Sequence, residues 1–510
     1  MVSPANLPAH LTALLRPEAY PHRVAAVQLV ETHISWVFLT GELAYKIKRP
    51  VHYPFVDLRS RERRAFFCAE ELRLNRRFAP ALYLGVCAVT LENGAARISG
   101  SGEVIDHAVC MRQFRAADEL GALLDRGAAA PDELAEFGAW LARAHQQLPR
   151  VDAGEPWGRA ASIRAGLLTN LTECQRAAEV FGAADAVRAL AEPYRARLEA
   201  DMPALEARRT AGHVRECHGD LHVGNIVRYG GRLVPFDCME FEPAFRWIDV
   251  AEEIACLHMD LGVRGCAREA QAFLGGYLFE SGDYPACRLL RLYGIHRALV
   301  RAKVAALRLA RDEHGRYLAW AGERLAAQRP PLILMCGVAG SGKTWLARQL
   351  AAALGAVHLR SDLERRRIAG LDVRQRSGSG LGEGLYTEAM GVATYARLRA
   401  CAAEALAGVL PVIVDATFQR RDQRAKFAAL AAEHAAALRV VHCHAPPAVL
   451  EARVAARAAA GTDASEADRA VLSLQEARFE PISAAENLPV VDADTTADDV
   501  LSRVLRQIPP

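Results

Sequence analysis

Two motifs in this 510-residue sequence have residue types and spacings suited to chemistry on phosphates. The first reads G-x-x-x-x-G-K-T and consists of Gly337, Val338, Ala339, Gly340, Ser341, Gly342, Lys343 and Thr344. Its glycines would let backbone N–H groups close around phosphate oxygens at the start of a helix, where an anion is favoured. We expect Lys343 to reach the β- and γ-phosphates of ATP or GTP, and the Thr344 hydroxyl to bind Mg²⁺.

The second motif, from His218 to Asn225, reads H-x-D-x-x-x-x-N. At this spacing Asp220 can accept the proton of an attacking hydroxyl group, and Asn225 can turn back to a Mg²⁺ ion. A hairpin with a Gly-Gly turn is predicted directly after it. That hairpin would return Asp237 to Asn225, where Asp237 would supply a second metal ligand.

A lysine and a glutamate upstream could complete this second constellation. Lys46 lies on the second strand of a hairpin predicted over 32–39 and 43–48, and Glu71 lies on a helix predicted over 61–78. Such a pair places ATP phosphates in kinases, with Glu70 as the alternative carboxylate here. Only five of the 63 basic residues are lysines, so each one is a candidate for a position that needs a compact ammonium group. They are Lys46, Lys48, Lys303, Lys343 and Lys426.

Residues 20–315 resemble the aminoglycoside phosphotransferase-like branch of the protein-kinase fold, through His218-Gly219-Asp220, Asn225 and Phe236-Asp237. The resemblance implies that Asp220 is the catalytic base and that Asn225 and Asp237 bind Mg²⁺. It also implies that Lys46 and Glu71 position the phosphates of ATP.

The same resemblance assigns two further residues and shows one departure. Met111 would lie on the hinge strand that meets adenine, and Asp249 would be the buried aspartate that braces the catalytic loop. The glycine-rich loop that the family places before Lys46 is missing, and residues 32–36 stand in its place.

The segment around Asp237 indicates the kind of acceptor. Only eleven residues separate Asp237 from Asp249, and no A-P-E sequence follows, so there is no long segment to dock a peptide. We therefore expect a small-molecule acceptor with a hydroxyl group. Glu240 and Glu242 fit either a cationic acceptor or a structural ion pair.

Strands and helices alternate after Lys343, which predicts an open parallel α/β sheet with its sites at the carboxyl ends of the strands. Asp362 follows one such strand and could take a proton from an acceptor hydroxyl, while Arg365 could hold an acceptor anion. The alternative is that Ser361 or Asp362 only caps a helix. Asp415 ends another apolar strand and could hold Mg²⁺ through water.

Residues 331–500 resemble the P-loop kinase-like family that includes the kinase domain of phage polynucleotide kinase. The matching pieces are the phosphate loop, Ser361-Asp362-x-x-Arg365, Val414-Asp415-Ala416-Thr417 and Arg453-x-x-x-Arg457. Arg453 and Arg457 share one helix face and could close over the phosphates as a lid.

Two further stretches of this part of the chain have a weaker signal. The glycine-rich loop 377–384 is expected to gate the acceptor site. His442 and His444 share one strand face with no third ligand near them in the sequence, which favours a structural role over metal binding.

Length and composition limit the number of domains, the location and the partners that we expect for this chain. The length requires at least two domains, and Arg329-Pro330-Pro331 separates an α+β protein-kinase-like domain (1–328) from an α/β P-loop domain (329–510). The chain has no 18-residue apolar run and no signal-peptide pattern, so we expect a cytoplasmic protein without a membrane span. Its twelve scattered cysteines indicate reduced thiols. A net charge of +3, with 21 basic and 20 acidic residues in 331–510, disfavours nucleic acid as a partner.

The whole chain resembles bacterial fusions of an aminoglycoside phosphotransferase-like domain with an ATP-binding domain. It is therefore expected to be an ATP- and Mg²⁺-dependent phosphotransferase with two nucleotide sites. One alternative is a single small-molecule kinase that a P-loop switch or ATPase domain controls. The other is a pseudokinase binding module fused to a P-loop kinase, which the missing glycine-rich loop leaves open. The identity of either acceptor and the oligomeric state stay open.

Overall fold

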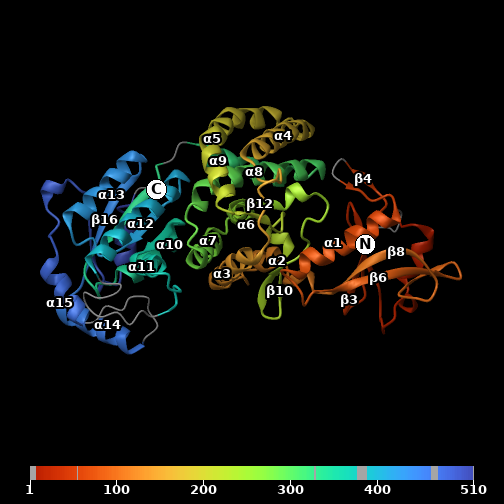
Figure 1. Ribbon diagram of the computed structural model, residues 1–510, viewed down its shortest axis with the longest axis horizontal. Coiled ribbons are helices and arrows are strands. Elements are labelled where there is room, and N and C mark those ends of the chain that lie inside the picture. Colours follow the sequence, from red (N-terminus) through yellow and green to blue (C-terminus); the bar gives the residue numbers. More distant parts are fainter. Residues whose placement is uncertain (1–6, 54–55, 327–328, 376–386, 461–468, 509–510) are drawn as a thin grey trace. The chain divides into compact units, whose positions relative to one another are not determined.

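The computed structural model describes residues 7–53, 56–326, 329–375, 387–460 and 469–508, and these form two compact units (Figure 1). The first unit comprises Met1–Glu133, Ala144–Ser162 and Glu206–Leu257. The second comprises Leu134–Arg143, Ile163–Leu205 and His258–Pro510. The second unit therefore contains helices from both sequence-based domains, and the division at residues 328 and 329 stays a proposal.

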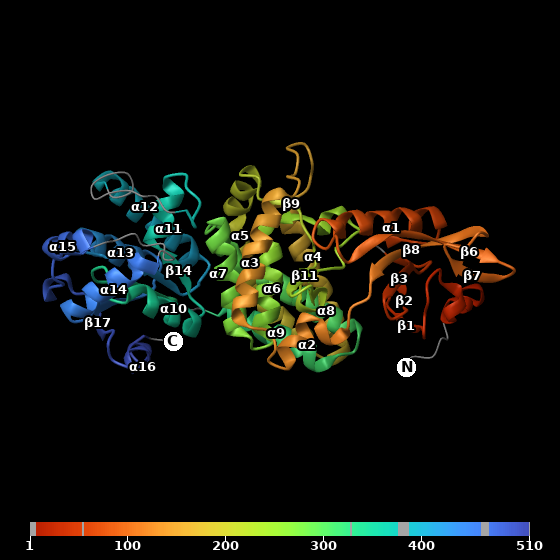
Figure 2. The ribbon, with the colours of Figure 1, turned by 90° about the horizontal axis from the view of Figure 1, so that it is seen from below.

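The first unit is built on a six-stranded antiparallel sheet. In spatial order its strands are β1 (Gln28–Glu31), β2 (Ser35–Leu39), β3 (Leu43–Lys48), β8 (Glu103–Arg112), β6 (Tyr83–Glu92) and β7 (Ala95–Ile98). Helix α1 (Arg61–Arg76) runs along one face of this sheet (Figure 2). The opposite face carries Tyr45 and Ile47, which pack with Leu11 and Leu14 of the N-terminal segment. Because side chains alternate along a strand, Lys46 and Lys48 of β3 point to the α1 face.

Short elements complete the first unit. They are β4 (His52–Tyr53), β5 (Val56–Asp57), α2 (Leu120–Asp125), β9 (Val214–Glu216), β10 (Ile226–Tyr229), β11 (Arg232–Pro235) and β12 (Trp247–Asp249). Strands β10 and β11 form the hairpin that the sequence predicts, with Gly230 and Gly231 both at positive φ in its turn. Helices α3 (Pro131–Gln147) and α6 (Val250–Val263) contribute residues to both units.

The second unit contains the predicted parallel sheet. In spatial order its strands are β14 (Val357–Arg360), β15 (Val412–Asp415), β13 (Pro331–Cys336), β16 (Ala437–His444) and β17 (Val490–Asp494), and all four pairings are parallel. Every residue of β13 and β15 is buried, as helices on both faces require.

After β13, the described residues of this unit form seven helices. They are α10 (Lys343–Leu354), α11 (Ser361–Ile368), α12 (Glu388–Ala407), α13 (Arg421–Glu433), α14 (Pro447–Ala460), α15 (Arg469–Arg478) and α16 (Val500–Leu505). Leu346 and Leu350 of α10 and Val500 and Val504 of α16 pack on one face of the sheet. Helices α12 and α13 also contact its strands.

The same unit holds helices from before the linker. It contains α7 (Ala267–Ser281), α8 (Ala286–Leu307) and α9 (Arg311–Leu325) whole, and most of α4 (Ala160–Ala178) and α5 (Ala184–Thr210), whose outer ends belong to the first unit. Side chains tie these helices to the P-loop fold. Arg367 Nη2 of α11 donates to Phe279 O at 2.5 Å, and Arg197 Nη1 donates to Ala407 O at 2.8 Å. Across the described residues, none of the helices has the length and apolar character that a membrane span requires.

Two candidate active sites

The first candidate site forms where β3, α1 and the end of the β10–β11 hairpin meet. Lys46 Nζ donates to Glu71 Oε1 at 2.9 Å and to Asp237 Oδ1 at 2.5 Å. Glu70 faces away and pairs with Arg73 and Arg246, so Glu71 is the glutamate in contact with Lys46. Burial disfavours the charged form of Lys46, but the charges of Asp237 and Glu71 hold its pKa well above the ordinary value.

A second lysine, Lys48, joins this group from two positions along the same strand. It donates to Glu71 Oε2 and to Glu240 Oε1. Its side chain and that of Glu71 are fully buried, and Glu240 is 3% exposed. Glu240 is therefore part of a structural ion pair, and Glu242 accepts from Ala244 N as a turn cap. Neither contact points to a cationic acceptor.

The His218–Asn225 motif, called the catalytic loop here after the role that the resemblance implies, lies between β9 and β10. Asn225 Nδ2 donates to the carbonyl of Asp220 at 3.0 Å, and Phe236 N donates to Asn225 O at 2.9 Å. This second bond brings the end of the hairpin, and so Asp237, back to Asn225. His222 Nε2 lies 3.5 Å from Asp220 Oδ2, a neighbour that the sequence did not single out.

Asp237 has an unusual backbone. Its φ of 65° lies in the left-handed region, which aspartate tolerates better than most residues, and such conformations gather at functional sites. The hydroxyl of Tyr83 accepts from Asp237 N at 3.0 Å, and Asn75 Oδ1 accepts from Cys238 N at 3.0 Å. Asn75 also donates to Glu71 O, so α1 holds the segment that carries Asp237. Met111 is 7% exposed and packs in the same apolar cluster as Tyr83.

Glu253 of α6, not Asp249, braces the catalytic loop. Its two carboxylate oxygens accept from His218 N at 2.7 Å and from Gly219 N at 2.9 Å. Asp249 instead holds Arg208 through two bonds of 2.7 and 2.8 Å. The expectation for Asp249 is wrong because Asp249 ends β12, whereas Glu253 lies one helical turn further on, beside the loop backbone. An acidic residue one turn into a helix after Trp247-Ile248-Asp249 was the signal available in the sequence.

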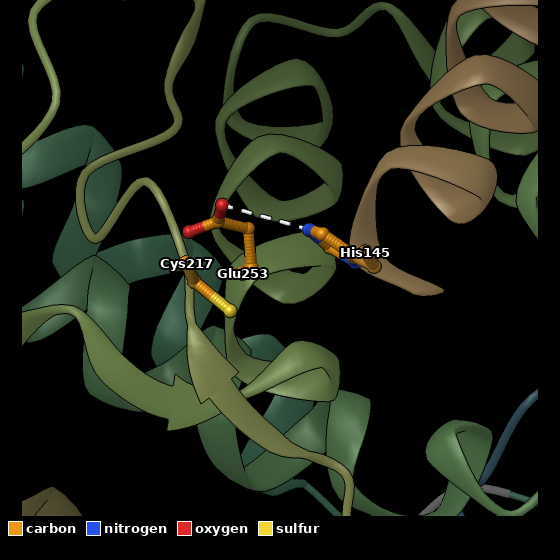
Figure 3. Close-up of side chains that lie close together, drawn as sticks. All are labelled: His145, Cys217 and Glu253. Atoms are coloured by element: carbon orange, nitrogen blue, oxygen red, sulfur yellow. Dashed lines mark ion pairs between the residues drawn. The ribbon is translucent and has the colours of Figure 1, made fainter. Parts of the chain in front are cut away.

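Figure 3 shows Glu253 with two buried neighbours, His145 and Cys217. One ligand atom from each lies within 4.8 Å of the other two, and His145 Nε2 is 3.6 Å from Glu253 Oε1. Both Glu253 oxygens already accept backbone N–H groups, and burial raises the pKa of the Cys217 thiol well above its ordinary value. A cysteine binds a metal ion as its thiolate, and the raised pKa keeps Cys217 as a thiol. The cluster therefore serves to support the catalytic loop.

The second candidate site surrounds the phosphate loop between β13 and α10. Gly337 has a φ of 139°, and a Cβ there would lie 2.3 Å from Cys443 O, so only glycine fits. Lys343 Nζ donates to Val338 O at 2.7 Å, inside its own loop. Burial lowers the pKa of Lys343, an effect that the negative charge of Asp415 opposes.

Asp415 ends β15 beside the phosphate loop, as the sequence predicts for a strand-end carboxylate. His358 of β14 lies 3.3 Å from Asp415 Oδ2, and Arg360 lies 4.0 Å away. Burial would raise the pKa of Asp415, but the hydrogen bond and charge of His358, with Arg360 and Lys343, lower it to about 2. Sequence reasoning missed His358, although the parallel pairing of β14 with β15 places it beside Asp415.

Asp362, on the first turn of α11, and Arg365, on the next turn, lie together. Arg365 Nη1 donates to Asp362 Oδ1 at 3.0 Å. The cap position of α11 falls on Arg360, so neither Ser361 nor Asp362 is the cap residue. The capping alternative is thus wrong, and the two side chains form a carboxylate–guanidinium pair at the carboxyl end of β14.

The predicted lid residues lie on α14. Arg453 donates to Gly340 O at 3.3 Å and to Thr495 Oγ1 at 2.8 Å, so it contacts the phosphate loop through its backbone. Arg457 lies one turn further along the same helix. Gln475 of α15 accepts from Ala339 N at 2.7 Å, a contact that the sequence did not suggest.

Two remaining predictions have different outcomes. His442 and His444 do have a third group beside them, because Asp492 of β17 lies 2.9 Å from His444 Nε2 and 3.7 Å from His442 Nδ1. The paired strand β17 supplies it, which sequence distance concealed. The loop 377–384, expected to gate the acceptor site, lies outside the described residues.

Two family models match different parts of the chain. A family model described as "Phosphotransferase enzyme family" matches residues 59–290, and one described as "AAA domain" matches residues 332–482. The chain is thus a fusion of a phosphotransferase domain, with the α+β kinase-like fold, and a P-loop domain with a parallel sheet. Both kinds of domain imply nucleotide binding.

Relatives match nearly the whole length of the chain. "Uncharacterized protein Rv2004c" of Mycobacterium tuberculosis is 30% identical over 460 residues, which cover 89% of this chain and 91% of the relative. "Uncharacterized protein Mb2027c" of Mycobacterium bovis matches to the same extent. Among solved structures, a choline/ethanolamine kinase family protein from Mesorhizobium loti is 14% identical, with 59% of this chain and 86% of that chain covered and a TM-score of 0.31. A gluconokinase from Sinorhizobium meliloti is 21% identical, with 35% and 93% covered and a TM-score of 0.26.

Proposed function

The chain belongs to the family of these mycobacterial proteins, and we propose that it is a small-molecule phosphotransferase with two ATP- and Mg²⁺-dependent sites. The observation that carries the proposal is the contact of Lys46 with both Glu71 and Asp237. Three residues from different parts of the chain meet there in the arrangement that places and neutralises ATP phosphates.

In the first site we assign Asp220 as the base that accepts the proton of the acceptor hydroxyl. Its neighbour His222 would help to hold the carboxylate, and Glu253 would hold the loop backbone. Lys46 would direct its ammonium group to the phosphates while Glu71 keeps it in place. Met111 would contribute to the adenine pocket.

In the second site the phosphate loop, 337–344, would bind the phosphates of a second ATP molecule. Asp362 would act as the base for a second acceptor, and Arg365 would hold an anionic group of that acceptor. Arg453 and Arg457 would act from α14 on the charge that develops during transfer. The existing contact of Arg453 with Gly340 supports a role next to the loop.

The donor groups of both sites fit Mg²⁺, which prefers oxygen ligands. In the first site these are Asn225 and Asp237. The side chain of Asp237 is 44% exposed, so a Mg²⁺ ion can reach it, whereas the side chain of Glu71 is buried. In the second site they are the Thr344 hydroxyl and Asp415, whose low pKa keeps it charged at neutral pH. Bound Mg²⁺ would neutralise phosphate charge.

A second candidate function is a P-loop switch that controls a single kinase site. The contacts of Gln475 with Ala339 N and of Arg453 with Gly340 O favour it. These bonds join α15 and α14 directly to the loop, so a change in the loop when nucleotide binds would alter the contacts of both helices.

The test is phosphoryl transfer from γ-labelled ATP into a bacterial metabolite extract, with ATP hydrolysis recorded in parallel. Wild type is compared with Asp220→Ala and Lys343→Ala. We expect each variant to lose a different labelled product, because each change disables one site. Removing a catalytic base or the phosphate-loop lysine should reduce transfer by about 100-fold or more.

Two other outcomes would change the conclusion. Loss of the same product in both variants means that the domains share one reaction or that one controls the other. Loss of hydrolysis alone in Lys343→Ala makes the second domain a switch or ATPase. The control is Lys303→Ala, a lysine on α8 paired with Glu173 outside both sites, which should keep both products.

A further inference from the structure

We propose that Lys48 is a positioning residue of the first site. It holds Glu71 and Glu240 together, so that Glu71 keeps Lys46 directed to the nucleotide and the segment after Asp237 stays attached to the sheet. The inference rests on the proposed function of that site, in which Lys46 binds ATP phosphates.

The geometry gives each oxygen of Glu71 its own lysine. Oε1 accepts from Lys46 and Oε2 accepts from Lys48. A carboxylate held at both oxygens cannot rotate about its last bond, so its orientation is fixed before nucleotide arrives. If Lys48 were removed, Oε2 would lose its charged partner in a fully buried place, and the carboxylate would be free to turn away from Lys46.

Lys48 also links two segments that carry the site. Glu240 lies three residues after Asp237 on the segment that leaves the β10–β11 hairpin, and Lys48 lies two residues after Lys46 on β3. Their ion pair is buried on both sides, at 0% and 3% exposure. Phe241 covers the ammonium group of Lys48, with its ring centroid 5.0 Å away.

The turn between β1 and β2 explains why the orientation of Lys46 and Glu71 must be fixed by another side chain. In place of a glycine-rich loop the chain has a tight turn, in which Thr32 N donates to Ser35 O and Thr32 Oγ1 accepts from Ser35 N. Arg49 donates to Thr32 O and packs on Trp36, which holds this turn against the sheet. The phosphates must therefore be placed mainly by side chains, and an ammonium group with a fixed partner does this best.

The experiment measures Mg·ATP affinity of the full-length chain by calorimetry in a Lys343→Ala background, which silences the phosphate loop. Lys48→Met should weaken Mg·ATP binding by about 10- to 100-fold, the effect of one lost charged hydrogen bond. In the labelling assay the KM for ATP of the first-site product should rise by the same factor. A site that is merely destabilised would lose active protein, and so kcat, at an unchanged KM.

Two variants separate positioning from stability. Arg64→Met breaks another buried ion pair of α1, the one with Asp106 on β8, and should lower the melting temperature without changing Mg·ATP affinity. The double variant Lys48→Met/Glu240→Met removes the unpaired charge of Glu240 and should restore stability but leave binding weak.

Four results would decide against the inference. Equal loss of affinity in Arg64→Met, or full recovery in the double variant, means that Lys48 only neutralises a buried charge. Unchanged affinity in a folded Lys48→Met protein overturns the positioning role and leaves the proposed function intact. Failure of the Lys343→Ala chain itself to bind Mg·ATP removes the proposed function, and this inference with it.

Discussion

Single buried side chains set the charge of two carboxylates in the proposed sites, the metal ligand Asp415 and the lysine partner Glu71. Asp415 and Glu71 are both buried, a condition that by itself would raise the pKa of each group. His358 with its neighbours lowers the pKa of Asp415 to about 2, and the two lysines lower that of Glu71 to about 2. Both carboxylates are therefore charged at neutral pH because a specific partner holds them.

The partner of Asp415, His358, can be removed by mutation. We expect His358→Ala to raise the Mg²⁺ concentration needed for the second-site product by about 10- to 100-fold, as loss of an outer hydrogen-bond partner does at metal sites. The measurement is product formation against Mg²⁺ concentration. His358→Gln, which keeps an N–H donor, is the matched control and should lie closer to wild type. An unchanged Mg²⁺ requirement in His358→Ala would show that Asp415 needs no help from β14, or that it does not bind the metal.

At the scale of elements, helix α6 determines the shape of the catalytic loop. Two backbone N–H groups of the loop, those of His218 and Gly219, are satisfied by the Glu253 carboxylate of this helix. Gly219 next to Asp220 has a φ of 90°, and a Cβ there would lie 2.6 Å from Phe245 O. The loop therefore depends on a glycine that allows its backbone and on a helix that holds it.

We expect Glu253→Gln to reduce the first-site product by at least about 10-fold and to destabilise the protein by about 1–3 kcal/mol, because an amide N–H₂ would face a backbone N–H. Asp249→Asn disrupts a comparable buried contact, with Arg208, but does not touch the loop. It should destabilise the protein with a smaller effect on kcat. Labelled product and thermal unfolding are measured for both variants, and equal effects on kcat would remove the special role of Glu253.

At the scale of the whole molecule, the P-loop fold and helices from before the linker form one compact unit. Arg367 of α11 reaches Phe279 O, Gln271 of α7 reaches Ala356 O, and Gly408 lies where a Cβ would come within 2.1 Å of Cys287 O. Helix α11 carries Asp362 and Arg365, so part of the second site is supported by helices of the preceding domain.

These contacts predict the thermal stability of fragments of the chain. A fragment that begins at residue 258 keeps α7, α8 and α9, whereas one that begins at residue 329 exposes the surface that these helices cover. We expect the shorter fragment to melt about 5–10 °C lower, from the loss of a few kcal/mol of packing. Thermal unfolding of both fragments, with the full chain as reference, measures this difference. Equal melting temperatures would show that the P-loop domain is stable without the helices.

The sequence alone determined the local part of this protein. The phosphate loop, the Lys46 hairpin, the Asp220–Asn225 spacing and the Gly-Gly hairpin are encoded within short stretches, because glycine conformations and alternating apolar residues act over a few residues. The parallel sheet followed from the same local patterns. These features were also the ones that carried the family resemblance.

Only the tertiary structure decided which side chains share a buried space. The choice of Glu71 over Glu70, of Glu253 over Asp249, and the presence of Lys48, His358 and Asp492 beside their partners all depend on contacts between elements far apart in the chain. Such contacts arise from strand register and helix rotation, where a shift of one residue turns a side chain to the other face. No single stretch of sequence records that register, and for this reason the supporting residues came from the fold.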